Sequence, residues 1–302
     1  MKFLIFSDLH HAVGSFDAGT YEDLKFFEQR AKKEGCDFII HAGDLCHGPT
    51  IKDNPDYVAA YNALDIPTYH CIGNHDADGS SYEDVLRHYR MENGYYYIDG
   101  KDARLIVLNP NYYCEDGEYV NYSMANYHPV SSRDHVPPEQ LEWLKETIES
   151  SETPCILLSH QSFERPDGVK NRDAVLEIIR RANARRKNSV VMCINGHSHK
   201  DYMRMMDGVC FWEVNSASFE ILEHRHSHYP KELCEKIVHI NATLVVNDPI
   251  CAVVTVEGNT IDVKGMKSSF FMGVTKDMTE DPFLDAAGRE ATAEIRDFHV
   301  EF

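Results

Sequence analysis

The sequence lacks a long hydrophobic run and a paired-cysteine motif. No apolar stretch approaches the roughly 18 residues of a membrane-spanning helix, so we expect no membrane segment. The nine cysteines are scattered and include no Cys-x-x-Cys pair. Several lie within apolar runs, where a thiol acts as a small hydrophobic side chain. This usage favours a reducing compartment, so we expect a cytoplasmic protein.

Basic residues are also scarce. Thirty Lys and Arg stand against 49 Asp and Glu, which gives a formal net charge of −19. A protein that grips long nucleic acid through its phosphates needs a basic face, so we expect no such partner. A small anionic substrate would instead be attracted by local positive charge, such as that of bound metal ions. The oligomeric state is left open.

What the sequence does contain is an alternation of apolar runs and amphipathic segments. Hydrophobic residues make up 43% of the 302, enough for one large domain. Apolar periodicity predicts helices over residues 20–34, 56–64, 82–91, 137–144 and 172–187. Residues 250–263 resemble a hairpin. The pattern predicts an α/β fold with two mixed sheets in a single domain, residues 1–302, with a motif-bearing core (1–220) and a C-terminal part (221–302).

Five short polar clusters each follow an apolar run that resembles a buried strand. They are Asp8-Leu9-His10, Gly43-Asp44, Gly73-Asn74-His75-Asp76, Ser159-His160 and Gly196-His197-Ser198-His199. Their aspartate, asparagine and histidine side chains are nitrogen and oxygen ligands suited to divalent metals. If the strand ends gather at one sheet edge, the clusters form a polynuclear metal site.

The ordered clusters resemble the signature of the calcineurin-like metallophosphoesterases: D-x-H, G-D, G-N-H-D/E, H and G-H-x-H. All five blocks occur in order between Asp8 and His199, without a substitution at a ligand position. The resemblance implies a four-layer α/β/β/α sandwich of two mixed β-sheets flanked by helices. It also implies a hydrolase that cleaves a small phosphate mono- or diester, such as a nucleotide or cyclic nucleotide, by a metal-activated hydroxide.

The resemblance further implies which residues bind two divalent metal ions. Asp8 and His10 lie two residues apart, so at a strand end both side chains point the same way and can bind one metal. The family pattern adds His199 to that metal and makes Asp44 a bridge between the two. The second metal is completed by Asn74, His160 and His197. Such mixed ligands permit Mn, Fe, Zn or Co.

The catalytic prediction concerns the residues that follow Asn74. His75 is the candidate general acid that protonates the leaving alkoxide, and Asp76 is the candidate carboxylate that orients its imidazole. Two further residues are predicted to contact substrate from their positions: His47 follows the bridging aspartate, and Arg165 follows His160.

Two features have open interpretations. The tyrosine-rich stretch 95–127 is either a lid that stacks on a base or a surface excursion packed on the core, and packing is favoured. The alternating histidines at 224, 226 and 228 resemble either a metal tract or a polar rim, and the rim is favoured.

The residues near Gly43-Asp44 argue against two subfamilies of these enzymes. Purple acid phosphatases carry a tyrosine where this chain has His47, and the protein Ser/Thr phosphatase pattern after Gly43-Asp44 is also absent. The motif order leans toward cyclic-nucleotide phosphodiesterases and nucleotide hydrolases. A nuclease is the alternative enzyme, and a noncatalytic scaffold that keeps the fold is the alternative outside the enzyme class.

Overall fold

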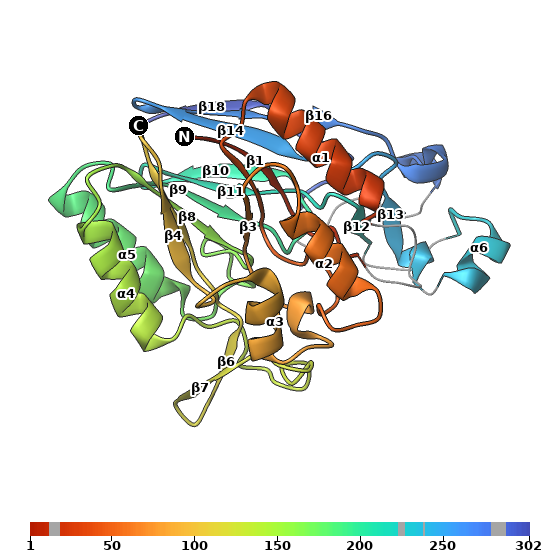
Figure 1. Ribbon diagram of the computed structural model, residues 1–302, viewed down its shortest axis with the longest axis horizontal. Coiled ribbons are helices and arrows are strands. Elements are labelled where there is room, and N and C mark those ends of the chain that lie inside the picture. Colours follow the sequence, from red (N-terminus) through yellow and green to blue (C-terminus); the bar gives the residue numbers. More distant parts are fainter. Residues whose placement is uncertain (12–18, 223–226, 238, 279–287) are drawn as a thin grey trace.

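Two six-stranded sheets form the centre of the computed structural model, which describes residues 1–11, 19–222, 227–237, 239–278 and 288–302 (Figure 1). The first sheet contains, in spatial order, β18 (Phe298–Glu301), β15 (Thr260–Lys264), β14 (Ala252–Glu257), β1 (Lys2–Phe6), β2 (Phe38–His41) and β3 (Thr68–His70). The second contains β10 (Tyr202–Met206), β11 (Val209–Glu213), β9 (Val190–Asn195), β8 (Cys155–Ser159), β5 (Arg104–Val107) and β4 (Tyr96–Asp99).

Both sheets are mixed. Strands β1, β2 and β3 run parallel, whereas β14 pairs antiparallel with β1. In the second sheet β5, β8, β9 and β11 run parallel, and β4 and β10 are antiparallel edge strands. Parallel strands carry their carboxyl ends to one edge, and this edge is where the polar clusters of the sequence emerge.

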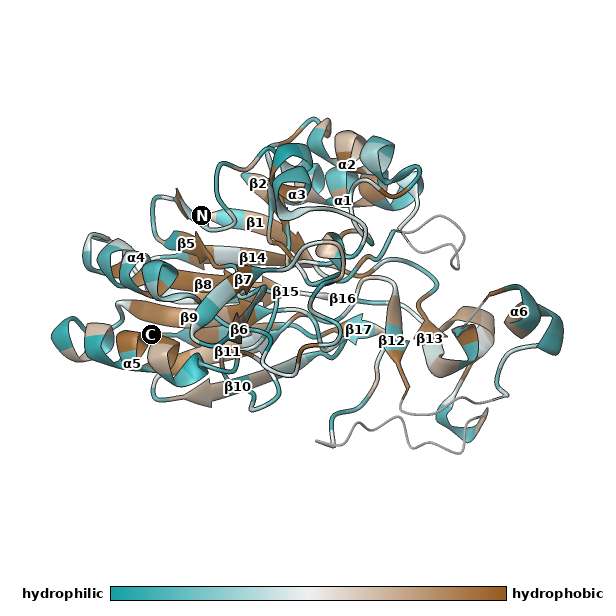
Figure 2. Cartoon of the chain, turned by 90° about the horizontal axis from the view of Figure 1, so that it is seen from below, coloured by the Kyte–Doolittle hydropathy of each residue, from teal (hydrophilic) through white to brown (hydrophobic). Residues whose placement is uncertain are grey.

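Helices cover the outer face of each sheet (Figure 2). Helices α1 (Tyr21–Glu34), α2 (Asn54–Asn62) and α3 (Tyr82–Tyr89) pack on the first sheet, and α4 (Pro138–Glu149) and α5 (Arg172–Arg185) pack on the second. A separate apolar cluster, which includes Phe3, Ile5, Leu158 and Ile194, fills the space between the sheets. The predicted four-layer α/β/β/α sandwich is confirmed.

Helix α1 shows how local sequence sets these elements. The Thr20 hydroxyl accepts from the backbone N–H of Asp23 (3.3 Å), and the Asp23 carboxylate accepts from the N–H of Thr20 (2.7 Å), which is a capping box. Gly35 ends the helix in the left-handed conformation with φ of 69°. Leu24, Phe27 and Ala31 form the buried face.

Smaller elements lie outside the two six-stranded sheets and the helices that cover them. They are the pairs β6 (Tyr112–Glu115) with β7 (Glu118–Asn121), β12 (Phe219–Ile221) with β13 (Thr243–Val245), and β16 (Met266–Lys267) with β17 (Glu294–Ile295), helix α6 (Lys231–Lys236), and the 3-10 turns η1 (His75–Ala77), η2 (Ile240–Ala242), η3 (Phe271–Gly273) and η4 (Lys276–Met278). In Figure 2, β12, β13 and α6 lie to one side of the two sheets.

The structure describes the tyrosine-rich stretch in full and the alternating histidines in part. The tyrosine-rich stretch contains the β6–β7 hairpin, which periodicity did not reveal, and Tyr112, Tyr122 and Tyr127 are buried. Their burial agrees with packing rather than an open base-stacking lid. Of the three alternating histidines, His224 and His226 lie outside the described residues, while Nε2 of His228 donates to the carbonyl of Thr243 (2.9 Å).

The C-terminal part contributes to the first sheet, because β14 pairs directly with β1 and is followed outward by β15 and β18. The single-domain organisation stays a prediction. No helix within the described ranges is both long and apolar enough to cross a bilayer.

Candidate metal centre

Seven polar side chains converge at the carboxyl ends of five parallel strands. Asp8 and His10 follow β1, Asp44 follows β2, Asn74 follows β3, His160 follows β8, and His197 and His199 follow β9. The strand ends are level, since the register pairs Phe6 with His41, His41 with His70, and Ser159 with Asn195. The alternating segments of sequence therefore deliver their polar residues to one place between the two sheets.

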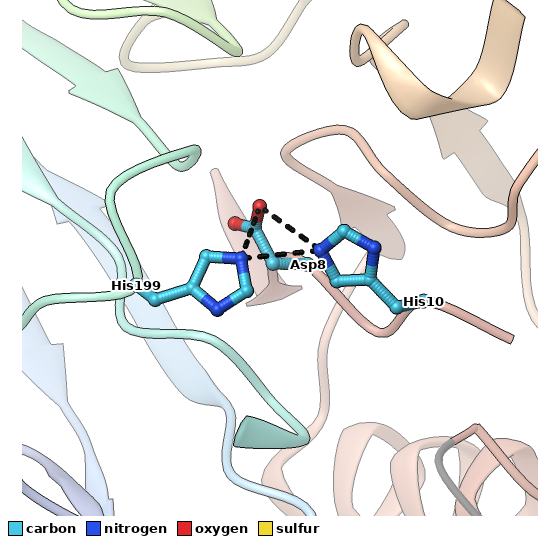
Figure 3. A group of neighbouring side chains, drawn as sticks. All are labelled: Asp8, His10 and His199. Atoms are coloured by element: carbon cyan, nitrogen blue, oxygen red, sulfur yellow. Dashed lines mark hydrogen bonds and ion pairs between the residues drawn. The ribbon is translucent and has the colours of Figure 1, made fainter. Parts of the chain in front are cut away.

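The first group consists of Asp8, His10 and His199, which point toward a common space (Figure 3). Asp8 Oδ1 lies 3.3 Å from His199 Nε2 and 3.7 Å from His10 Nε2. The two imidazole Nε2 atoms are 3.1 Å apart. All three residues are buried, and three ligand atoms this close can hold one cation.

The second group consists of Asp44, His160 and His197. Nε2 of His160 lies 3.1 Å from Asp44 Oδ2 and 3.3 Å from Nδ1 of His197. Asp44 and His160 are buried, and His197 is the most exposed of the three. The groups adjoin each other, since Asp44 Oδ2 is also 3.8 Å from His10 Nε2. A carboxylate in this position can contact cations in both groups.

Two buried oxygens in this space lack a hydrogen-bond partner among the described residues: Asp8 Oδ1 and Asn74 Oδ1. The Asn74 amide is held from its other end, where Nδ2 donates to the hydroxyl of Tyr127 (3.3 Å). Leaving a buried carboxylate or amide oxygen unsatisfied is unfavourable. A pair of divalent cations would satisfy both atoms, so the residues present fit the metals that the sequence pattern implies.

Backbone carbonyls fix the orientation of two histidines. Nδ1 of His160 donates to the carbonyl of Ala42 (2.7 Å), and Nδ1 of His199 donates to the carbonyl of Phe219 (2.6 Å). Each bond keeps a proton on Nδ1, so Nε2 is the ring nitrogen left to bind a metal. These Nε2 atoms are the ones that face the carboxylates.

The electrostatics favour positive charge at this site, because its buried carboxylates depend on neighbouring histidines for their counter-charge. Burial would raise the pKa of the Asp8 and Asp44 carboxyls, but nearby histidines hold both well below the usual range. Burial would lower the pKa of His160, but the carboxylates of Asp44 and Asp8 raise it to about 10. Burial lowers the pKa of His10 to about 3 and that of His197 to about 4, so these two rings are neutral.

Unusual backbone conformations accompany these side chains. Five of the seven residues have a positive φ: Asp8 (52°), His10 (54°), Asp44 (52°), His197 (71°) and His199 (52°). Each such conformation costs on the order of 1 kcal/mol or more for a non-glycine residue. Strain concentrated on these positions is typical of functional sites.

Glycine is required next to two of these residues. Gly43 has φ of 102°, and a Cβ there would overlap the ring of His160. A Cβ on Gly73 would overlap the Asp44 carboxylate. The glycines thus allow loops from neighbouring strands to approach closely.

The structure corrects the orienting role predicted for Asp76. Its carboxylate is fully buried and accepts from the backbone N–H groups of Gly73 (2.8 Å), Asp44 (3.1 Å) and Cys46 (3.2 Å) and from the Tyr89 hydroxyl (2.6 Å). In the described part of the chain, no hydrogen bond joins it to the His75 imidazole. Asp76 instead ties together the loops that follow β2 and β3.

Asp78 takes the position next to His75 that was predicted for Asp76. Nδ1 of His75 donates to Asp78 Oδ2 (2.6 Å), and the Tyr127 hydroxyl donates to Asp78 Oδ1 (2.7 Å). Burial would lower the pKa of His75, but Asp44 and Asp78 raise it to about 9. The sequence reasoning missed Asp78 and Tyr127. The spacing of three residues between His75 and Asp78, which brings side chains together in a 3-10 turn such as η1, could have indicated the first.

The two predicted substrate contacts lie in different surroundings. His47 is next to the first group, with Nε2 3.2 Å from Nδ1 of His10 and Nδ1 3.7 Å from Asp78 Oδ2. Arg165 lies in a surface pocket with Arg204 and Arg289, and its guanidinium pairs with Asp167 and with Glu213 (3.5 Å). Both roles stay predictions.

A family model described as calcineurin-like phosphoesterase matches residues 1–201 of the 302. No curated protein matches the sequence.

Solved structures resemble the fold at low sequence identity. A dimetal phosphatase from Danio rerio superposes with a TM-score of 0.65 at 15% identity, covering 100% of this chain and 98% of that one. GAP50, described as the anchor in the inner membrane complex of Plasmodium, gives 0.54 at 15% identity over 88% of this chain and 84% of that chain. Purple acid phosphatase PPD1 from yellow lupin gives 0.52 at 15% identity, covering 88% and 51% respectively.

Proposed function

Because the chain belongs to the calcineurin-like phosphoesterase family, we propose that it hydrolyses a small phosphate mono- or diester at a pair of divalent metal ions. The observation that carries the proposal is the juxtaposition of two ligand groups through one carboxylate. Asp44 Oδ2 lies 3.1 Å from His160 of one group and 3.8 Å from His10 of the other.

We assign the first metal to Asp8, His10 and His199, the second to Asn74, His160 and His197, and the bridge to Asp44. The unsatisfied oxygens of Asp8 and Asn74 support this division. Bound as a pair, the cations supply a water of lowered pKa and neutralise phosphoryl oxygens. Imidazole and carboxylate ligands suit Mn, Fe, Zn or Co.

The protein's own contribution to bond cleavage is a proton for the leaving group. His75 is the general acid, and Asp78, not Asp76, keeps its Nδ1 protonated and its Nε2 end free to face substrate. The raised pKa of His75, about 9, supports a protonated ring at neutral pH in the metal-free protein. Asp76 acts indirectly by holding the backbone of Asp44 and Gly73 in place.

The substrate is small in this proposal, with a nucleotide or cyclic nucleotide as the class to be tested first. A net charge of −19 disfavours a nuclease that follows a long phosphate backbone. His47 supports a substrate-facing role by its place beside His10 and its half-exposed ring. No observation in the described residues favours a noncatalytic scaffold, since all seven side chains and His75 lie together. The predicted cytoplasmic location stays a prediction.

Metal analysis combined with hydrolysis of bis-nitrophenyl phosphate and nitrophenyl phosphate tests the proposal. We expect about two metal ions per chain and turnover that Mn²⁺ restores after chelation. The variant Asp44→Asn should lose both. A matched control is Asp262→Asn, an exposed carboxylate on β15 that pairs with His299, far along the first sheet from β2. A wild-type chain that binds no metal and shows no Mn²⁺-dependent turnover would favour the scaffold.

A further inference from the structure

A second pocket of about 400 Å³ lies beside the edge strands β3 and β4, separate from the seven ligand residues. It is bounded by the end of α2, by β3, by the end of α3 and by the segment leading into β4, and its lining includes Asn62, His70, Tyr89, Arg90, Tyr95 and Tyr96. The Tyr96 hydroxyl joins the two sheets there, because it donates to the carbonyl of His70 (2.7 Å) and accepts from its N–H (3.2 Å). The volume falls in the range of small-molecule sites.

The lining of the pocket combines tyrosine rings with the guanidinium group of one arginine. Tyr69, Tyr89, Tyr95 and Tyr96 all border the pocket. The guanidinium of Arg90 also lines it and makes no hydrogen bond or ion pair with any residue that the structure describes. Glu92, on the exposed rim, is the acidic residue of the lining. Ring faces bind planar groups and a free guanidinium binds phosphate or carboxylate.

The floor of the pocket connects to the metal centre by a directed chain of hydrogen bonds. The N–H of Gly43 donates to Nδ1 of His41 (3.2 Å), so Nε2 of His41 carries the proton and donates to Nδ1 of His70 (2.8 Å). Nε2 of His70 then donates to the Asn62 side-chain oxygen (2.8 Å). His70 and Asn62 border the pocket, whereas Gly43 directly precedes Asp44.

A second connection runs through Tyr89. Its ring stacks on His70, with centroids 4.1 Å apart, and its hydroxyl donates to Asp76 (2.6 Å). Asp76 in turn holds the N–H groups of Gly73 and Asp44. A ligand that shifts His70 or Tyr89 therefore acts on both loops that carry metal-site residues of the first sheet.

We propose that this pocket is an effector site for a small anionic molecule with a planar aromatic ring, such as a nucleoside monophosphate. The ring would lie against the tyrosines and the anionic group would pair with Arg90. Through His70 and Tyr89, its occupancy would change the affinity of the metal centre for its ions. Because coupling between two sites is reciprocal, metal binding would change the ligand affinity by the same factor.

Intrinsic fluorescence can report on this pocket. The chain has two tryptophans: Trp143, whose ring lies 4.8 Å from Tyr95, and Trp212, which is fully buried between the sheets. The probe is the phosphonate analogue of AMP, in which a methylene group replaces the ester oxygen and prevents hydrolysis. We expect a saturable change in emission that disappears in Trp143→Phe and persists in Asp44→Asn, where the metal site is impaired.

The decisive variant is Arg90→Asn. Arg90 has φ of 56°, and asparagine tolerates that conformation, so the charge is removed with little effect on the backbone. We expect the dissociation constant to rise about 10-fold or more, as for the loss of a charged hydrogen bond. The control is Arg87→Gln: this exposed arginine lies in the last turn of α3, the helix that Arg90 caps, pairs with Asp84 and does not line the pocket.

Three results would overturn the proposal. They are the absence of a saturable signal, equal affinity in wild type and Arg90→Asn, and equal affinity for adenosine and the phosphonate. The effector role would also fail if a saturating probe left the Mn²⁺ affinity of the wild-type protein unchanged. These outcomes leave the proposed hydrolase activity intact, because that activity is measured with nitrophenyl substrates on the unliganded protein.

Discussion

At the scale of single residues, the candidate metal centre contains side chains placed to bind cations and side chains that hold neighbouring groups in place. Asp8 and Asn74 each present an unsatisfied oxygen to the shared space. Asp76 and Asp78 lie two residues apart, yet one is fully buried under backbone N–H groups and the other contacts His75. These two neighbouring carboxylates therefore have different contacts, and substituting each should change a different property of the protein.

The first prediction concerns His75→Gln. Loss of a general acid matters most when the leaving group is a strong base, so turnover of an alkyl phosphate ester should fall by about 100-fold or more. Turnover of a nitrophenyl ester, whose leaving group needs no proton, should fall by less than about 10-fold. Steady-state kinetics with both substrates at saturating Mn²⁺ check this. Equal losses for the two esters would reject the role of His75.

The second prediction compares Asp78→Asn with Asp76→Asn. Asp78→Asn should show the leaving-group pattern of His75→Gln in weaker form, since it removes the negative charge beside Nδ1 of His75. Asp76→Asn replaces one acceptor oxygen with an NH2 group that faces backbone N–H donors, so it should lower the free energy of unfolding by about 2–4 kcal/mol. Urea unfolding of the metal-free proteins measures the difference. Unchanged stability in Asp76→Asn, or a larger loss in Asp78→Asn, would contradict this division.

At the scale of elements, the ends of parallel strands define the site, and the close approach of their loops keeps it in place. Loops after β2 and β3 meet where Gly73 faces the Asp44 carboxylate. The loop after β9 returns past β1, where the N–H of His197 donates to Asp8 Oδ2 (3.0 Å). Phe219 of β12 covers the site from the other side, with its ring 5.0 Å from that of His10.

The third prediction tests this loop contact with Gly73→Ala. The added methyl group would overlap Asp44 Oδ1, so Asp44 must move, and we expect less than half of the wild-type metal content and a corresponding loss of turnover. The control is Gly117→Ala in the β6–β7 turn. Gly117 has φ of 85°, and a Cβ added there would meet only open space. That variant should lose about 1 kcal/mol of stability and keep its metal. Normal metal content in Gly73→Ala would show that the loops tolerate the displacement.

How much of this was predictable follows from the range of the interactions involved. Helix α1 was predictable because Thr20, the apolar positions and Gly35 lie within one local segment. That the seven polar residues lie together was predictable, because they follow five apolar runs whose ends meet at one place. The β6–β7 hairpin was not, since the tyrosine-rich stretch packs through long-range contacts, such as those of Tyr122 and Tyr127 with Ala77. The partner of His75 was missed because the choice between Asp76 and Asp78 depends on which one the loop after β2 covers.

At the scale of the whole molecule, the net charge of −19 and the buried carboxylates both favour cation binding. In the metal-free protein, the carboxylates of Asp44 and Asp8 raise the pKa of His160 from 6.5 to about 10. The protonated His160 ring therefore supplies part of the positive charge that balances these carboxylates. A raised pKa means that His160 stabilises the metal-free fold fully below pH 6.5 and that this contribution is lost as the pH rises through about 10.

The fourth prediction follows from that proton. A metal ion must displace it from Nε2 of His160, so the apparent affinity for Mn²⁺ should rise with pH up to about 10, by at most about 10-fold per unit. Titration calorimetry in buffers of different ionisation enthalpy would count the protons released. An affinity that stays flat or falls between neutral and mildly alkaline pH would contradict the role of His160.

The most direct measurement is anomalous diffraction from crystals of the Mn²⁺-loaded protein. The account predicts two peaks about 3.5–4 Å apart, with the Asp44 carboxylate between them. Asp8, His10 and His199 should surround one peak, and Asn74, His160 and His197 the other. A single peak, or two peaks too far apart to share Asp44, would contradict the central claim.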